Sequence, residues 1–226
     1  MAARVAARPR GFREVYTDAV QRRRDELCFG TWAVGFLLAW WRIARDPDPV
    51  GVWDRFPRLF AGEWRPETPV AWIFLLAGVG LRIWAAGNLE KNRFDHPAGP
   101  YRLVRHPLYL GTLLVSLSFF LSIGIPGTGL CLWGILLLAV FLPVLRKEER
   151  ELAQWFPGPY RRYMSRVPAL LPALRAFPQA LEADRFTMER ARRNFGLRAL
   201  WLLAAVLVLN VVLEWWIWHR WHWPAV

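Results

Sequence analysis

The sequence predicts an all-α protein, a polytopic helical bundle with about five membrane-spanning helices. Two observations indicate this fold class. Apolar blocks long enough to cross a hydrocarbon layer of roughly 30 Å alternate with arginine-rich blocks. The chain is also 55% hydrophobic with 15 Trp residues, yet its formal net charge is +12. Nucleic-acid binding is the other usual interpretation of so basic a chain. It is disfavoured because the arginines flank apolar spans and form no separate basic domain.

Five apolar stretches are predicted to be spans. They are residues 29–43, 69–86, 107–123, 129–145 and 198–218. The first is short and ends before a proline-rich turn. The loop 46–68 after it has Trp and Phe scattered among charges, as in segments that lie at the membrane interface. Near the end of the second span, Arg82 is expected to extend its guanidinium to the headgroups.

The third and fourth spans are joined by the short sequence GIPGTG, residues 124–129. So short a connection predicts an antiparallel hairpin. The start of the third span, with His106, and the end of the fourth, with Glu149, are therefore expected at the same membrane face. The polar region 147–197 follows, with helical turns predicted at 148–155 and 160–166 and with repeated prolines that break it up.

The predicted organisation is a basic cytosolic segment, a first pair of spans with an external loop, a core that contains the third and fourth spans, and a last part that combines an amphipathic cytosolic segment with the final span. Their boundaries are residues 1–28, 29–88, 89–175 and 176–226. A long polar stretch precedes the first apolar run, which is unlike a secretory signal. The two cysteines, Cys28 and Cys131, are expected near opposite membrane faces and unpaired. Together with the four histidines they show no metal-binding spacing.

Orientation follows from the distribution of Lys and Arg. With the N-terminus inside, 23 of the 30 Lys and Arg residues lie in cytoplasmic segments and five in external ones. The positive-inside rule favours this topology. It predicts an integral membrane protein with the N-terminus and residues 99–111 and 146–172 on the cytoplasmic side and the C-terminus external. A composition rich in Ala, Arg, Trp and Pro is typical of a high-GC bacterium, so the membrane is predicted to be a bacterial inner membrane.

The stretch GPYRLVRHPLYLG, Gly99 to Gly111, lies where a basic loop meets the third span. Pro107 has no backbone N–H and suits the first turn of a helix, so the helix is predicted to start near His106. The first turn has free N–H groups at a positive dipole end, which can hold a carboxylate or a phosphate. Arg105 and His106 add cationic and hydrogen-bonding groups that suit the same anion.

These residues resemble the membrane methyltransferases typified by isoprenylcysteine carboxyl methyltransferase, with the phospholipid methyltransferases as relatives. The pattern GxYxxxRHPxYxG is matched by Gly99, Tyr101, Arg105, His106, Pro107, Tyr109 and Gly111. A Glu pair, a Leu and the pattern FGxxYxxYxxxVPxxxP are matched by Glu148, Glu149, Leu152, Phe156, Tyr160, Tyr163, Val167, Pro168 and Pro172. The family's Gly after the Phe is replaced by Pro157, so the bend before Tyr160 is expected to differ. The resemblance covers about a third of the chain.

The resemblance implies that residues 89–175 are a catalytic core, with S-adenosylmethionine as cofactor in a pocket at the cytosolic face. As acceptor it implies a lipophilic or small molecule such as an isoprenylcysteine-type carboxylate, a lipid amine or a thiol. The implied cofactor-binding residues are Tyr101, Arg105, His106, Tyr109, Glu148, Glu149, Tyr160 and Tyr163; the implied catalytic residues are Glu149, Arg146 and His106. Cations suit the cofactor's carboxylate, a glutamate suits its ammonium group, and tyrosine rings suit its sulfonium. Membrane lipids are expected partners and nucleic acid is not. Which glutamate contacts the cofactor, whether a general base is needed, and the oligomeric state stay open.

Structural roles compete with these assignments. His106 can simply order its loop, and either glutamate can pair with Arg146 or Arg150 on a solvated helix face. Two other function classes also stay open. One is a sterol or enoyl reductase that uses NADPH, although such enzymes tend to have an Arg-Asp-Glu cluster and a Trp at the position of Tyr160. The other is a non-enzymatic transporter or assembly factor, although no ionisable residue lies in the middle of the first four spans.

Overall fold

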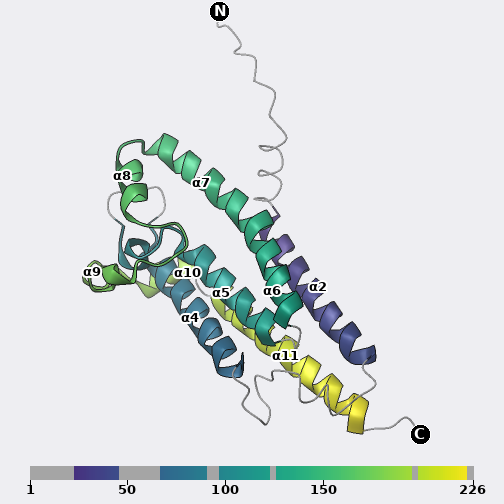
Figure 1. Cartoon of the computed structure of the whole chain (residues 1–226). Helices are drawn as coiled ribbons and strands as arrows, with labels where there is room; N and C mark the ends of the chain where they lie inside the picture. Colours follow the sequence, from purple (N-terminus) through teal and green to yellow (C-terminus); the bar gives the residue numbers. More distant parts are fainter. Residues whose placement is uncertain (1–22, 46–66, 91–96, 123–125, 195–197, 223–226) are drawn as a thin grey trace, which may run out of the picture.

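The protein is a bundle of long helices with several short ones packed at one end (Figure 1). The computed structural model describes residues 23–45, 67–90, 97–122, 126–194 and 198–222. All regular secondary structure within these ranges is helical. The long elements are α2 (Arg24–Arg45), α4 (Glu67–Asn88), α5 (Pro107–Ser122), α6 (Pro126–Ile135), η2 (Leu136–Phe141), α7 (Leu142–Trp155) and α11 (Arg198–His222). The short ones are η1 (Gly99–Arg102), α8 (Pro159–Arg166), η3 (Leu174–Ala176), α9 (Phe177–Glu182) and α10 (Met188–Arg193).

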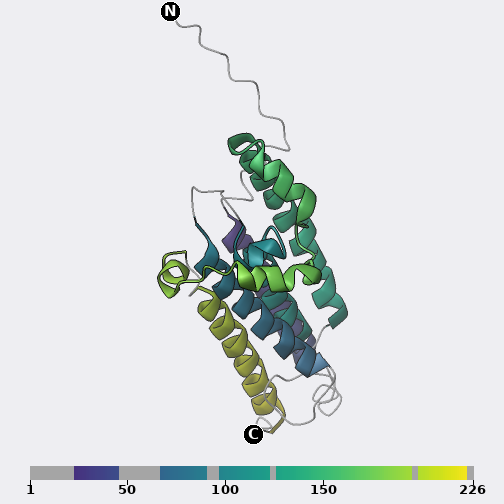
Figure 2. The ribbon, with the colours of Figure 1, turned by 90° about the vertical axis from the view of Figure 1, so that its left-hand side faces the viewer.

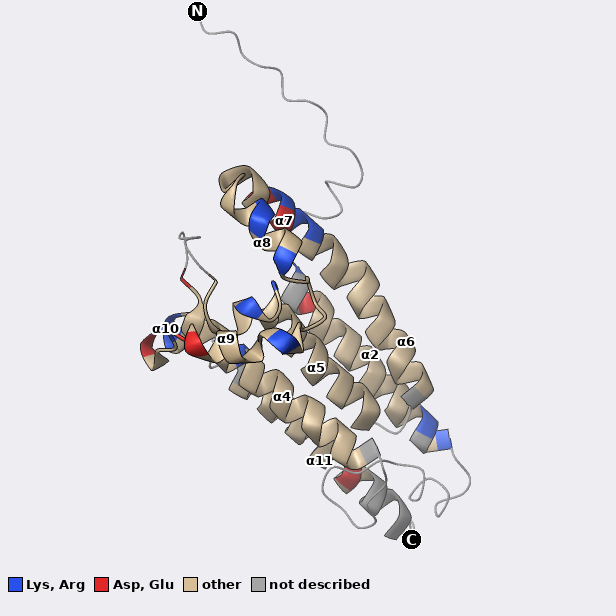
Figure 3. Cartoon of the chain, turned by 60° about the vertical axis from the view of Figure 1, so that its left-hand side comes forward, with Lys and Arg blue, Asp and Glu red and all other residues tan. Residues whose placement is uncertain are grey.

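Two helical stretches are long and apolar enough to cross a membrane, Thr68–Asn88 and Gly127–Trp155. They contain the second and fourth predicted spans. Pro107–Ser122 and Leu200–Trp216 are shorter apolar stretches, and α2 contains the first predicted span, so the count of five spans stays a prediction. The predicted interfacial loop 46–68 lies outside the described residues except for its last two. Figure 3 shows most of the coloured charges at the end of the bundle where α7 and α8 lie.

Helix α5 is the centre of the bundle. It contacts α2, α4, α6 and α11, and Val115, Phe119 and Phe120 are fully buried in the core. A helix that is apolar on every side is stable only when it is surrounded. Figure 2 shows α11 running beside α4. The N-terminal end of α5, where the sequence motif lies, is therefore held by neighbours.

The closest helix crossing joins α4 to α5 at two glycines. A Cβ atom on Gly78 would lie 2.7 Å from the Gly111 carbonyl oxygen, so only glycine permits this approach. One turn further along, Arg82 Nη1 donates to the Leu108 carbonyl at 3.0 Å and to the Thr112 hydroxyl. The extension of Arg82 to the headgroups stays a prediction; in the structure its guanidinium turns toward polar atoms in the first turns of α5.

Gly78→Ala is therefore expected to lower the free energy of unfolding by about 1–3 kcal/mol, the usual range for overpacking a close contact. Gly80→Ala is the matched control, because Gly80 lies on the same helix with open space around it, and it should leave stability unchanged or slightly higher. Thermal unfolding of the two purified variants in one detergent measures the difference. Equal midpoints would contradict the tight crossing.

Helices α6, η2 and α7 form one continuous rod from Pro126 to Trp155. Its middle is π-helical, and the Leu142 N–H donates to the carbonyl of Leu137, five residues back. A π segment contains one residue more than the α-helix it interrupts. The π segment Leu136–Phe141 was not predicted from the sequence. Leu145 is the last buried apolar residue before the polar part of α7, Arg146 to Trp155.

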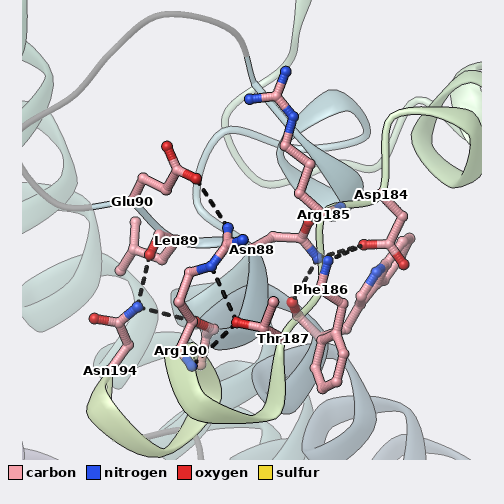
Figure 4. Close-up of polar contacts among 11 residues, drawn as sticks. Asn88, Leu89, Glu90, Asp184, Arg185, Phe186, Thr187, Arg190 and Asn194 are labelled. Atoms are coloured by element: carbon pink, nitrogen blue, oxygen red, sulfur yellow. Dashed lines mark hydrogen bonds and ion pairs between the residues drawn. The ribbon is translucent and has the colours of Figure 1, made fainter.

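The C-terminal end of α4 is capped by the segment that contains α10 (Figure 4). Asn194 Nδ2 donates to the carbonyls of Ala86 and Leu89 at 3.0 and 2.7 Å. Asn88 donates to the Asp184 carboxylate at 2.7 Å, and Arg190 pairs with Glu90 at 3.0 Å. The two Asn194 bonds satisfy carbonyls at the end of α4 that have no partner within the helix, and the contacts together fix α10 against the bundle.

Candidate functional site

The site is built from two loops that pair through their backbones. The Arg105 N–H donates to the Pro168 carbonyl at 2.9 Å, the His106 N–H donates to the Ala169 carbonyl at 3.2 Å, and the Ala173 N–H donates to the Leu103 carbonyl at 2.9 Å. The loop before α5 is thereby locked to the loop after α8. The two halves of the sequence motif are therefore directly connected, although more than sixty residues separate their paired positions.

Gly99 starts the first of these loops with φ of +52°, in the left-handed region that glycine adopts at little cost. A Cβ there would also lie 2.6 Å from Asn88 Nδ2. Its N–H donates to the Ala183 carbonyl at 3.3 Å. This turn leads into η1, and α5 follows, beginning at Pro107 as predicted.

Glu149 joins the two halves of the site. Its Oε1 lies 2.9 Å from Arg105 Nη2 and 3.1 Å from His106 Nε2. His106 is buried, and the Glu149 side chain is only 14% exposed. Arg105 also donates from Nη1 to the Met164 carbonyl at 2.9 Å, so it bridges α7 and α8. The predicted meeting of His106 with Glu149 at one end of the hairpin is present.

Burial raises the pKa of the Glu149 carboxyl, but the hydrogen bond from His106 and the charges of Arg105 and His106 outweigh it. The net pKa of Glu149 lies below its usual value. The pKa values of the tyrosines move the other way. Burial is the main cause that raises the pKa values of Tyr101, Tyr160 and Tyr163 above their usual range. Nearby carboxylates add to this effect at Tyr101 and Tyr160, whereas at Tyr163 the neighbouring Tyr160 and Tyr101 come next. These phenols are protonated at neutral pH and act there as hydrogen-bond donors, not as bases.

The four tyrosines of the motif lie around the same cluster. The Tyr163 hydroxyl donates to the Tyr101 carbonyl at 2.7 Å, and Tyr160 is buried with its ring 5.9 Å from that of Tyr163. The Tyr109 ring lies between His106 and Phe141, at centroid distances of 5.7 Å from each. Tyr163 thus holds the first loop by hydrogen bonding, and Tyr109 packs against the imidazole.

Three buried polar atoms in this cluster have no hydrogen-bond partner among the described residues. They are the Tyr101 hydroxyl, Arg105 Nε and Glu148 Oε2. Leaving such atoms unsatisfied costs about 1–3 kcal/mol each. A zwitterionic ligand requires donors for its carboxylate and an anionic acceptor for its ammonium group. The Tyr101 hydroxyl and Arg105 Nε–H are donors, and Glu148 Oε2 is such an acceptor. Arg146, the third predicted catalytic residue, is not one of these buried residues. It is exposed at the start of the polar part of α7, and its carbonyl accepts from Arg150 Nε at 3.1 Å.

Because the pKa of Glu149 is lower in the folded protein than in the unfolded chain, its charge stabilises the fold above the unfolded value of about 4.3. This stabilisation is lost as pH falls through the lower, folded-state pKa. The difference in thermal midpoint between the wild type and Glu149→Gln is therefore expected to be constant from neutral pH to about pH 5 and to shrink below it. Thermal scans from pH 7 downward measure it; a difference that grows on acidification would contradict the assignment.

Sequence comparisons point to two proteins. Over 104 residues, 44% of this chain and 45% of the relative, the sequence is 39% identical to the cobalt-zinc-cadmium resistance protein CzcN of Cupriavidus metallidurans. Over 74 residues it is 40% identical to Methanethiol S-methyltransferase 2 of Bradyrhizobium diazoefficiens. A third of the chain therefore resembles a methyltransferase. That match covers 27% of the relative, so the chain spans less than half the length of either protein. No family model and no solved structure matches the chain.

Within the described residues, no group of three or more His, Cys, Asp or Glu side chains is placed to hold a metal ion. Cys28 is buried and Cys131 is exposed, and no disulfide joins them.

Proposed function

We propose that the protein is an integral membrane methyltransferase that uses S-adenosylmethionine and acts at the cytosolic end of its helical bundle. The observation that carries the proposal is the buried cluster of Arg105, His106 and Glu149, with unsatisfied polar atoms on Tyr101 and Glu148 beside it. The similarity of a third of the chain to a methanethiol S-methyltransferase supports the same reaction class.

The residues fit the two charged ends of an amino-acid ligand. Glu148 offers a buried carboxylate oxygen for an ammonium group. Arg105 has a buried Nε–H that is still free to donate among the described groups, and it suits a carboxylate. Bound S-adenosylmethionine supplies a methyl group activated by a sulfonium charge. The protein's own contribution is to position the reactants and exclude water, which strengthens electrostatic interactions in the site.

Among the acceptors that stay open, a thiol suits this site best. A thiol must lose its proton before it attacks a methyl group, whereas a carboxylate does not. Glu149 orients the His106 ring by accepting from Nε2 at 3.1 Å. A neutral imidazole that donates from Nε2 keeps Nδ1 as an acceptor. An imidazole oriented by a carboxylate is the usual arrangement of a general base, so His106 is the proposed base.

Ligand titration of the detergent-purified protein tests the cofactor. Calorimetry is expected to show binding of S-adenosylmethionine and none of NADPH. The opposite pattern would replace the methyltransferase by a reductase. Acceptor classes are then compared by transfer of a radiolabelled methyl group to an alkyl thiol, an isoprenylcysteine carboxylate and a lipid amine. Cofactor binding without transfer to any of the three would overturn the proposed acceptor range.

A contribution to metal resistance is a second candidate, favoured by the longer match to the cobalt-zinc-cadmium resistance protein. It is compatible with methyl transfer. Growth of a strain that lacks the gene, with and without cobalt, zinc or cadmium, tests it. Rescue by the wild type but not by Glu149→Gln would connect resistance to the proposed site, and equal growth of all strains would remove this candidate.

A further inference from the structure

We propose that one side of helix α9 lies in the headgroup region of the bilayer, and that arginines around it bind anionic phospholipids. We call the three residues Leu174, Phe177 and Leu181 the α9 apolar flank. This inference concerns how the short helices meet the membrane. It does not depend on the cofactor or on the reaction.

The α9 apolar flank is exposed although it is firmly held. Phe177 and Leu181 are four residues apart on α9, which places them on one side of this helix, and Leu174 lies in η3, which directly precedes it. Leu174, Phe177 and Leu181 are 73%, 46% and 52% exposed. On the adjoining side Ala180 is fully buried against Leu103 and Val104. Because that contact fixes the helix, the fold itself presents three large apolar side chains to the surroundings.

The flank lies beside an exposed stripe of α4. Ile73, Ala77 and Gly80 are exposed at helical spacing, and Ile73 is 63% exposed on a helix long enough to cross the membrane. One turn further on, the partly buried Trp84 ring meets the Phe177 ring at a centroid distance of 6.3 Å. This ring contact joins the exposed side of α4 to α9. Surface of this kind at a span end is typical of helices that lie in the membrane interface.

The positive charge around α9 is the second argument for a contact with lipid. Arg175, Arg185 and Arg192 are exposed, and among the described residues none of their guanidinium groups forms an ion pair. Arg190 and Arg193, by contrast, pair with Glu90 and Glu189. Basic groups beside an apolar helix face are the usual signature of binding to anionic lipid. A bilayer around α4 that contains anionic lipid would contact both the α9 apolar flank and these arginines.

The test places an environment-sensitive fluorophore at single cysteines in a Cys28→Ala, Cys131→Ser background, in nanodiscs of mixed zwitterionic and anionic phospholipid. Leu181→Cys probes the flank. Gln179→Cys lies on the opposite, polar side of the same helix and is the matched control, and Ile73→Cys on α4 is the bilayer reference. The Leu181 probe is expected to be quenched by nitroxide lipids labelled near the headgroup and to lose quenching by aqueous iodide. The Gln179 probe should keep its iodide quenching.

A Leu181 probe as open to iodide as the Gln179 probe, with the Ile73 probe shielded, would overturn the proposal and leave the membrane location of α4 intact. The lipid charge is tested in the same samples. Replacing the anionic lipid by zwitterionic lipid should weaken the nitroxide quenching at Leu181, and combining Arg175→Gln, Arg185→Gln and Arg192→Gln should have the same effect in anionic discs. Quenching that is identical in both lipids would refute the role of the arginines.

Discussion

Glu149→Gln is expected to weaken S-adenosylmethionine binding by about 10- to 100-fold and to reduce methyl transfer at least as much. The wild-type carboxylate accepts from Arg105 and His106 at 2.9 and 3.1 Å. Hydrogen bonds to charged groups are worth about 1.5–3 kcal/mol, and each 1.4 kcal/mol is roughly a factor of ten in affinity. A neutral amide leaves the Arg105 charge without its counter-ion, so Arg105 and His106 lose their fixed positions.

Calorimetric titration and thermal unfolding of the same preparation separate a binding effect from a folding effect. Glu151→Gln is the matched control. Glu151 lies on the same helix, and its only described partner is Lys147 at 3.6 Å on the exposed side, where an ion pair contributes about 0–1 kcal/mol. It should bind nearly as the wild type does. If Glu149→Gln binds as well as Glu151→Gln does, the cluster has a structural role only and the proposed site is wrong.

The part of this site that could be predicted from sequence depended on chain geometry. A six-residue connection between two apolar stretches forces a hairpin, and a hairpin places His106 and Glu149 at the same end whatever its detailed packing. Pro107 likewise marks the first residue of α5, because proline is favoured only at the start of a helix. Local rules with few alternatives therefore located the site.

The remaining features depend on contacts between distant residues, which periodicity and spacing do not encode. Asn88 and Asp184 form a hydrogen bond across 96 positions, and neither residue belongs to a motif. Arg82 has the sequence context of a residue that reaches the headgroups, yet the close Gly78–Gly111 crossing brings the polar atoms of α5 within its reach. The signal that was present in the sequence is the pair of glycines, which suggests a close helix crossing.

The π segment was also beyond prediction, because Leu136–Phe141 reads LLLAVF, a run with no polar residue and no breaker. It lies in the same rod as Glu149. The Phe141 ring meets Tyr109 edge-on, which in turn packs on His106. The extra residue of this segment thus takes part in the alignment of α7 with the start of α5.

Deleting Arg146 is expected to abolish cofactor binding. Removal of one residue from a regular α-helix turns everything after it by about 100°, so Arg150 takes the position of Glu149 and faces Arg105 and His106. Like charges then replace the ion pair that joins the two halves of the site. Binding of S-adenosylmethionine by the folded, detergent-purified variant measures the loss.

Deleting Leu138 from the π segment is the matched control. Leu138 is largely exposed, and its removal lets the rod relax to a regular α-helix while the faces on either side keep their directions, since a π segment holds one surplus residue. This variant is expected to keep Glu149 beside His106 and to retain most of its binding. Because both deletions shorten the same rod by one residue, a difference between them reports the direction in which Glu149 points. Equal loss in both would mean that the length of the rod, rather than its register, decides binding.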